Sequence, residues 1–220
     1  MTAAAMNDEL HARYTTALRQ LAAVWQPLEG DSKPMLIEVP AAYASASLKL
    51  MVVGQEAGGW AKSVALTEGA ATPLMSLYTD FDLGRNQRPF TPFWQGAWKI
   101  AGGLGAASGL DSFLWSNLVK VDVGGRRPST VVEAAVASLR LVEQELAVTR
   151  PDAVVFFTGP TYDDRLKATC PGAAIEELGH GTARIHGMPF RAVRTYHPKY
   201  LRMKGHWAEL DKVVALLADA

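Results

Sequence analysis

The chain has 220 residues, in which 22 lysines and arginines balance 22 aspartates and glutamates, and it has one cysteine. The balanced charge excludes a protein that is basic overall, although it allows a local basic patch. A single cysteine excludes an intrachain disulfide framework and an all-cysteine metal or iron–sulfur site. No apolar run approaches the roughly 20 residues of a membrane span, and the first residues lack the pattern of a secretory signal. We therefore expect a cytoplasmic monomer without membrane contact, folded as one domain over residues 1–220.

The first expected element is an amphipathic helix over Asp8–Gln26, within an N-terminal helical segment of residues 1–30. Its apolar residues recur at helical spacing, and Pro27 and Gly30 end it. The Ala-rich residues that precede this helix are expected to fray.

Four short apolar runs bounded by Gly or Pro are typical of buried strands in a parallel sheet. Helical patterns follow at Phe93–Ile100, at Thr130–Thr149 with Ser129 or Thr130 as its N-cap, and at Trp207–Leu217. Strands that alternate with helices predict a doubly wound α/β fold. The long stretch Trp60–Pro92 has little periodicity and is interpreted as a loop. The expected strands are Lys49–Val53, Phe113–Val121, Ala153–Thr158 and Arg191–Thr195.

The segment after the first expected strand, residues 54–60, has the composition of a ligand-binding turn. In doubly wound sheets the site lies at the carboxyl ends of the strands. The glycines of this segment allow close approach of a ligand, and Glu56 places a carboxylate there that could activate water or offset positive charge. The alternative is a plain turn with a solvated glutamate.

The second strand contains a polar residue, Asn117, inside its apolar run. A buried amide needs hydrogen-bond partners, because leaving it unpaired costs roughly 1–3 kcal/mol. Its donor and acceptor together could read the edge of a pyrimidine, and the alternative is an asparagine bonded to neighbouring backbone.

The last strand leads into a window, residues 179–208, that has no acidic residue. This concentration of cations in a neutral protein suits the binding of phosphates, and Tyr200 and Leu201 place apolar groups inside the patch. The alternative is a solvated charged face. The cations of the window are Arg184, Arg191, Arg194, Lys199, Arg202 and Lys204.

Together, these strand-end motifs resemble those of the uracil-DNA glycosylase superfamily. Gly54-Gln55-Glu56 is similar to the first motif of the family, with Glu where the commonest branch has Asp. Asn117 resembles the residue that reads uracil, Val154–Pro160 resembles the strand and turn that follow, and the segment His197–Gly205 resembles the His-Pro loop. The resemblance implies a three-layer αβα fold around a central, mainly parallel four-stranded sheet.

The resemblance implies a monofunctional DNA glycosylase of base-excision repair, which flips uracil or a related damaged pyrimidine out of DNA and hydrolyses its N-glycosidic bond. Glu56 would stabilise the sugar cation and position or deprotonate water, and His197 would donate a hydrogen bond to the departing base. Asn117 would read the Watson–Crick edge of the flipped base. Neither a metal nor another cofactor is implied, because the iron–sulfur branches need four cysteines.

The resemblance also implies the groups that hold the base and the DNA. Phe90 would stack on the base, with Phe81 as the second choice, and Leu201 would act as the wedge that fills the gap left by the flipped nucleotide. DNA contacts would extend along the segment that contains Leu201: Lys199, Tyr200, Arg202 and Lys204.

The departures from the family pattern affect the expected base specificity, and they leave open which residue of the first motif positions the water. Gly58 stands where the commonest branch has a tyrosine that excludes thymine, so the chain is expected to tolerate 5-substituted uracils; Trp60 is an alternative gate. Gln55 is a base-binding candidate, and it is also the alternative to Glu56 as the residue that positions the attacking water. Ala57 and Lys199 replace the Pro and the Ser that are usual at these positions.

Two other functions remain open from the sequence. The chain could share the fold and bind nucleic acid or a nucleotide without cleaving it, because fold does not guarantee chemistry. It could also hydrolyse free nucleosides, in which case it would show no salt-dependent binding to DNA.

Overall fold

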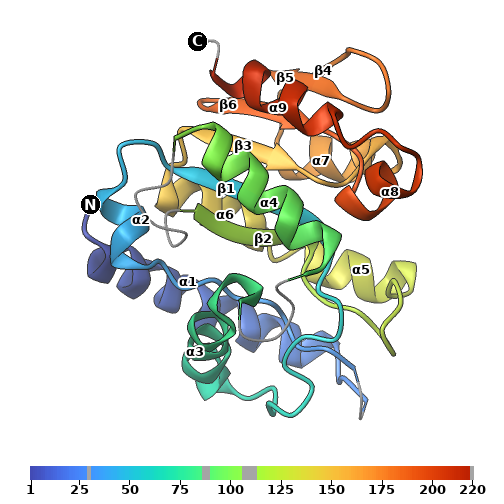
Figure 1. Cartoon of the computed structure of the whole chain (residues 1–220). Helices are drawn as coiled ribbons and strands as arrows, with labels where there is room; N and C mark the ends of the chain where they lie inside the picture. The colour runs from blue at the N-terminus through green and yellow to red at the C-terminus, as the bar shows by residue number, and fades with distance from the viewer. Residues whose placement is uncertain (29–30, 86–89, 106–112, 219–220) are drawn as a thin grey trace.

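Within the described residues, which are 1–28, 31–85, 90–105 and 113–218 of this computed structural model, six strands form one sheet (Figure 1). Their order is β2-β1-β3-β6-β5-β4. The first four strands in this order run parallel, whereas β5 is antiparallel to both β6 and β4. The strands are β1 (Leu50–Glu56), β2 (Phe113–Val119), β3 (Ala153–Phe156), β4 (Ala174–Glu177), β5 (Ala183–His186) and β6 (Arg191–Arg194).

All four apolar runs of the sequence form strands, and these are the four parallel neighbours. The expectation of a four-stranded sheet is nevertheless corrected, because the hairpin of β4 and β5 extends the sheet to six strands of mixed direction. The hairpin has no clear signal in the sequence. Its strands have four residues each, and three of the four residues of β4 are exposed, so no buried apolar run marks it.

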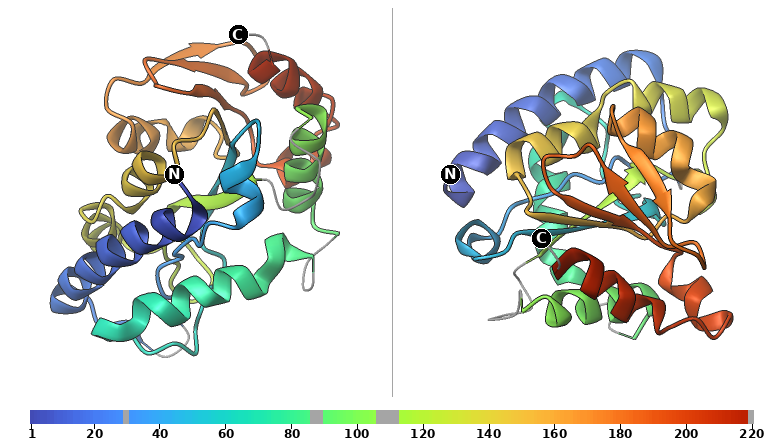
Figure 2. Two further views of the ribbon diagram at one scale, coloured as in Figure 1. Left: turned by 90° about the vertical axis from the view of Figure 1, so that its left-hand side faces the viewer. Right: turned by 90° about the horizontal axis from the view of Figure 1, so that it is seen from above.

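Helices cover both faces of the sheet, with α4 and α9 on one side and α1, α6 and α7 on the other (Figure 2). This arrangement is an α/β fold of the expected type. No helix among the described residues has the length and apolar character needed to cross a bilayer. The α-helices are α1 (Ala3–Val24), α2 (Ala41–Ser45), α3 (Ala71–Phe81), α4 (Pro92–Gly103), α5 (Thr130–Ala137), α6 (Leu141–Thr149), α7 (Asp163–Thr169), α8 (Pro198–Met203) and α9 (Glu209–Ala218).

The first helix begins earlier than the sequence pattern predicts. Helix α1 starts at Ala3 rather than Asp8, because the hydroxyl of Thr2 caps it by accepting a hydrogen bond from the Ala5 amide. Met6 is buried, so the Ala-rich start packs against the domain instead of fraying. The helix ends at Val24, two residues before the expected boundary.

The stretch Thr130–Thr149 is two helices rather than one. Ser129 caps α5 as expected, since its hydroxyl accepts a hydrogen bond from the Val132 amide. The chain then leaves the helical conformation at Arg140, whose φ of 52° lies in the left-handed region, and α6 begins at the next residue. Helical periodicity on both sides hides this break, because nothing in the local sequence requires a left-handed arginine.

The stretch Trp60–Pro92, interpreted as a loop, contains a full helix, α3. The buried residues of α3 recur every three or four positions and pack toward α1: Ala71, Leu74, Met75, Tyr78 and Phe81. This period is the signal of an amphipathic helix, and the Gly, Pro and Asp residues around it obscure it. Two single-turn 3₁₀ segments, Glu68–Ala70 and Asp82–Gly84, flank the helix.

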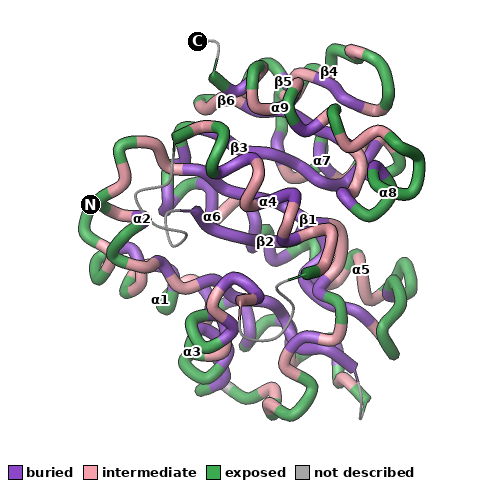
Figure 3. The backbone as a smooth tube through the Cα atoms, viewed as in Figure 1, coloured by how far each residue is buried: buried purple, intermediate pink, exposed green. Residues whose placement is uncertain are grey.

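An extended segment, residues 31–37, packs against the chain that leaves β2. The amides of Ser32 and Met35 donate to the carbonyls of Asp122 and Lys120, just beyond the end of β2. All residues of the segment are buried. The strands β1, β2 and β3 are also mostly buried, as their purple tubes in Figure 3 show.

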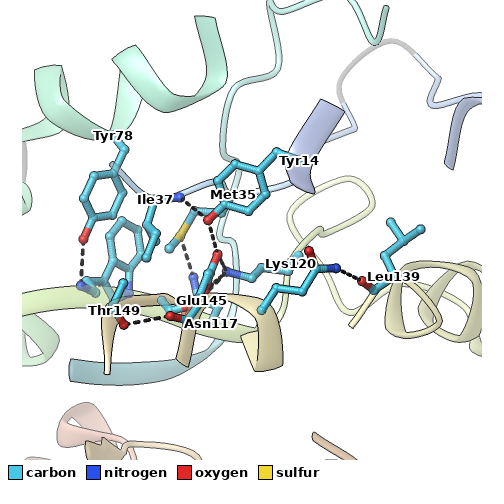
Figure 4. Close-up of polar contacts among 12 residues, drawn as sticks. Tyr14, Met35, Ile37, Tyr78, Asn117, Lys120, Leu139, Glu145 and Thr149 are labelled. Atoms are coloured by element: carbon cyan, nitrogen blue, oxygen red, sulfur yellow. Dashed lines mark hydrogen bonds and ion pairs between the residues drawn. The ribbon is translucent and has the colours of Figure 1, made fainter. Parts of the chain in front are cut away.

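Lys120 and Glu145 form an ion pair inside the protein, between β2 and α6 (Figure 4). Lys120 Nζ lies 2.6 Å from Glu145 Oε1 and 2.7 Å from Ser116 Oγ, while the Tyr14 hydroxyl donates to the same carboxylate at 2.9 Å. Both charged side chains are at most 2% exposed. Burial lowers the pKa of Lys120, and the adjacent carboxylate opposes this effect. Each charge therefore depends on the other for its stability in the core.

We expect Lys120→Met to destabilise the fold by about 3–5 kcal/mol, because it leaves the carboxylate of Glu145 buried without its cation. The double variant Lys120→Met, Glu145→Gln should recover part of this loss, since it removes both buried charges. Urea unfolding followed by circular dichroism measures the free energies. Lys99→Met is the matched control, because it breaks an exposed ion pair with Asp211 and should cost about 1 kcal/mol or less. A double variant no more stable than the single one would show that the ion pair is not the stabilising element.

Candidate functional site

A cavity of about 770 Å³ lies at the carboxyl ends of the parallel strands, where the topology of the sheet predicts a site. Its volume is in the range typical of small-molecule sites. The cavity lining combines the end of β1 and the loop that follows it, two residues of β2, the end of α3, the start of α4 and the segment after β6. It includes the following residues that the sequence singled out, the alternatives Trp60 and Phe81 among them: Gln55, Glu56, Gly58, Trp60, Phe81, Asn117, His197 and Lys199.

Glu56 is the last residue of β1, and its side chain is half-buried at the cavity. The hydroxyl of Tyr162 donates a hydrogen bond to its Oε1. Because this bond uses one carboxylate oxygen, the other can accept a hydrogen bond from a molecule in the cavity. The neighbouring residue, Gln55, is held differently: its Nε2 donates to the carbonyl of Thr158 at 2.9 Å, which joins β1 to the loop after β3.

Asn117 is 2% exposed and faces the same cavity from β2. Its Nδ2 donates to the sulfur of Met35 at 3.2 Å, which Figure 4 also shows, and sulfur is a weak acceptor. No donor in the described part of the chain reaches its Oδ1. The amide therefore retains hydrogen-bonding capacity that a ligand in the cavity can use, and it is not consumed by neighbouring backbone.

His197 follows β6 and is fixed by the turn that begins α8. Its Nδ1 accepts a hydrogen bond from the Lys199 amide at 3.1 Å, so the proton of the neutral ring is on Nε2. Burial, together with the charge of Lys199, lowers the pKa of His197 to about 4. The ring of Phe93 lies beside it, with the two ring centres 5.6 Å apart. The cavity therefore contains a neutral histidine that can donate from Nε2.

The loop after β1 is tied to the loop after β2 by a hydrogen bond to Asp122. The carboxylate of Asp122 accepts from the amide of Gly59 in the first loop and from the amide of Gly125 in its own loop. Gly58 has a φ of 64°, and a Cβ at this position would meet no atom within 4 Å. Trp60, the alternative gate, is 8% exposed and packs edge-on against Phe81 and Trp115. It therefore forms part of the cavity wall.

The aromatic ring next to Asn117 and His197 belongs to Phe93 rather than to Phe90. Phe90 is 83% exposed and is not part of the cavity lining. Phe93 is part of the lining, and its Cε2 lies 3.2 Å from the place where a Cβ of Gly54 would be. Phe93 lies in the first turn of α4, whereas Phe90 precedes the helix by two residues, and the start of the helix therefore turns the ring of Phe93 to the cavity. Phe81, the second choice, also lines the cavity.

The basic segment after His197 is placed only in part as expected. Lys199, Arg202 and Lys204 are exposed, and Tyr200 is 40% exposed. Leu201 is 0% exposed and packs in the core, so its side chain does not reach the surface as a wedge would. The exposed apolar side chain of this turn is that of Met203, at 70%.

The cations of the preceding strand do not belong to this surface. Arg194 is fully buried and bonds to the carboxylates of Asp163 and Glu177. Arg191 donates to the carbonyl of Leu217. The window without acidic residues therefore does not correspond to one basic face, because acidic residues from elsewhere in the chain neutralise part of it.

Three residues at or next to the cavity escaped the sequence reasoning: Phe93, Asp122 and Tyr162. Phe93 could have been found from its place at the start of an expected helix, next to a proline that often begins one. The contacts of Asp122 to the loop after β1 and of Tyr162 to Glu56 carry no local signal, because Asp122 lies 63 residues from Gly59 and Tyr162 lies 106 residues from Glu56 in the chain. Among the described residues, no group of three His, Cys, Asp or Glu side chains is placed to hold a metal ion.

No protein-family model matches the chain, and no curated protein matches it. A function must therefore be inferred from the side chains that line the cavity and from the resemblance of the three strand-end motifs.

Proposed function

We propose that the protein is a DNA glycosylase that hydrolyses the N-glycosidic bond of uracil or a related damaged pyrimidine. The observation that carries this proposal is the shared cavity of Glu56, Asn117 and His197 at the carboxyl ends of the parallel strands. The three side chains match the three needs of the reaction: a carboxylate for the sugar cation and water, an amide for the base, and a neutral donor for the leaving group. The motif resemblance supports the same reaction.

The base would enter the cavity after it flips out of the DNA. Asn117 would pair through its free amide groups with the Watson–Crick edge of the base, and the ring of Phe93 would stack on the face of the base. The amide would exchange a weak hydrogen bond to the sulfur of Met35 for hydrogen bonds to the base, so breaking the bond to sulfur would cost little binding free energy. The cavity volume is larger than a pyrimidine ring, so the cavity has room for substituents on the ring.

The bond between C1′ of the sugar and the base nitrogen breaks as negative charge moves onto the base. His197 would donate from Nε2 to the base oxygen that carries this charge, and a neutral ring does so without transferring its proton. Glu56 would stabilise the positive sugar and orient a water molecule toward C1′. The water oxygen forms the new bond to C1′, and its proton passes to Glu56 or to solvent.

The DNA backbone would be held by Lys199, which lines the cavity, and by Arg202 and Lys204, which are exposed toward the end of the same short helix, α8. Arg202 also lies over the ring of Trp207, 4.4 Å from its centre, and bonds to Gln95, so its position is fixed. Met203 lies in the same turn and can take the wedge role that the burial of Leu201 denies to that residue.

The first test is excision from uracil-containing single- and double-stranded oligonucleotides, with abasic sites detected by alkaline cleavage. Glu56→Gln and His197→Ala should each lower the excision rate by a factor of about 100 to 1000, as expected for the loss of one preorganised electrostatic contact. Glu176→Gln and His186→Ala are matched controls, because these side chains pair with each other on the exposed β4–β5 hairpin. Full activity of Glu56→Gln would mean that Gln55 or another group holds the water.

Binding without cleavage is the second candidate function, and the same oligonucleotides test it. The replacement of Asp by Glu in the first motif favours this candidate. Salt-dependent binding without abasic sites would establish it, whereas turnover of free nucleosides without DNA binding would establish a nucleoside hydrolase.

Replacing Arg202 and Lys204 with Ala should reduce the salt slope of DNA binding by about 1 for each lost phosphate contact.

We expect the pKa of His197 to rise in Lys199→Gln, because removal of the nearby positive charge favours the protonated ring. The rise should be partial, since burial is the larger cause of the low pKa. In the wild type the ring stays neutral above about pH 5, so excision should not change through this group between about pH 6 and 8. NMR titration of the ring protons measures the pKa, and Lys204→Gln serves as the control. A wild-type pKa near 6.5 would contradict the neutral-donor mechanism.

Gly58 predicts activity on uracils with a substituent at the 5-position, such as 5-hydroxymethyluracil. No side chain blocks that space, and Asn117 reads an edge that uracil and its 5-substituted forms share. Gly58→Tyr should narrow excision toward uracil. Gly58→Ala is its control, because both variants bear the strain of the φ of 64° and only one adds a ring. Rejection of the modified base by the wild type, with acceptance by Trp60→Ala, would identify Trp60 as the gate.

A further inference from the structure

Tyr162 lies directly behind Glu56, in the 3₁₀ turn Pro160–Tyr162 that follows β3. It is 6% exposed, and its hydroxyl donates to Glu56 Oε1. Strand β3 is the neighbour of β1, with Val53 opposite Phe156, so the ends of both strands bring the two side chains together. Tyr162 is not part of the cavity lining itself. Any effect of Tyr162 on a molecule in the cavity must therefore be exerted through the Glu56 carboxylate.

Two guanidinium groups fix the ring of Tyr162. The Cζ atoms of Arg127 and Arg165 each lie 5.3 Å from the centre of the ring, and both arginines bond to the carboxylate of Glu133. A ring held in this way keeps its hydroxyl in one place. The arrangement links the loop after β2, helix α5 and helix α7 to the single carboxylate at the end of β1.

We propose that Tyr162 is a positioning residue for Glu56: its hydroxyl holds Oε1, so that Oε2 faces the cavity where the water must be oriented. This inference rests on the proposed glycosylase function and names a group that the motif resemblance does not include. A glutamate has one more rotatable bond than the aspartate of the commonest branch, so its carboxylate needs an additional partner to be fixed.

The phenol is suited to this role because it stays protonated. Burial raises the pKa of Tyr162 above its usual value, and the hydrogen bond and charge of Glu56 raise it further, while Arg127 opposes them. At neutral pH Tyr162 is therefore protonated and donates. A protonated phenol keeps the carboxylate oxygen in the role of acceptor.

Tyr162→Phe tests the proposal, because it removes the hydroxyl and keeps the ring that both arginines contact. We expect kcat for uracil excision to fall about 10- to 100-fold with KM nearly unchanged, the range seen when an orienting group is lost. Tyr43→Phe is the matched control, because Tyr43 is equally buried but donates to the carbonyl of Thr149, away from the cavity.

A second measurement does not depend on activity or on the stability of Tyr162→Phe. With ¹³C-labelled tyrosine, the ¹³Cζ chemical shift of Tyr162 at neutral pH should change in Glu56→Gln, because the hydrogen bond from the phenol to a charged oxygen is lost. An unchanged shift, or wild-type kcat in Tyr162→Phe, would overturn the proposal. A changed shift in a protein that excises no base would support the contact and overturn the glycosylase function instead.

Discussion

Gly54 and Asn117 face each other across the ladder of β1 and β2, and a Cβ at residue 54 would lie 2.3 Å from Asn117 Oδ1. Only glycine allows the amide to occupy this place, because no real Cβ approaches an oxygen so closely. The same absent side chain leaves room for the ring of Phe93. The shape of the cavity at the end of the sheet therefore depends on one backbone position, and the proposed reading of a base by Asn117 would depend on it in turn.

Several ionisable groups at or next to the cavity already have hydrogen-bond partners in the protein. Glu56 is bonded to Tyr162, and Asp122 is satisfied by loop amides. The histidine is kept neutral by burial and by Lys199. The Glu56 carboxylate and the Lys199 ammonium, which have opposite charges, both line the cavity, and charges interact more strongly in a protein site than in bulk water. This arrangement suits the proposed reaction, in which opposite charges separate as the glycosidic bond breaks.

The parallel strands could be predicted from the sequence, because each is a buried apolar run bounded by Gly or Pro. Their carboxyl ends then predict that Glu56, Asn117 and His197 converge, and these residues do line one cavity. Features that depend on distant partners could not be predicted. The left-handed Arg140, the bond from Tyr162 to Glu56 and the burial of Leu201 are all decided by packing between segments far apart in the chain. The choice of Phe93 over Phe90 depends on where one helix begins, which is the least certain boundary in any sequence pattern.

The segment of residues 31–37 joins the stability of the fold to the cavity. It bonds to the chain just beyond β2, and it also supplies the sulfur that accepts from Asn117. The amide of Ile37 donates to the hydroxyl of Tyr14, which in turn bonds to the buried pair of Lys120 and Glu145. A weak acceptor at Met35 has a physical advantage here. A stronger acceptor would hold the asparagine more firmly but would compete with a base for the same donor, whereas sulfur orients the amide and releases it at small cost.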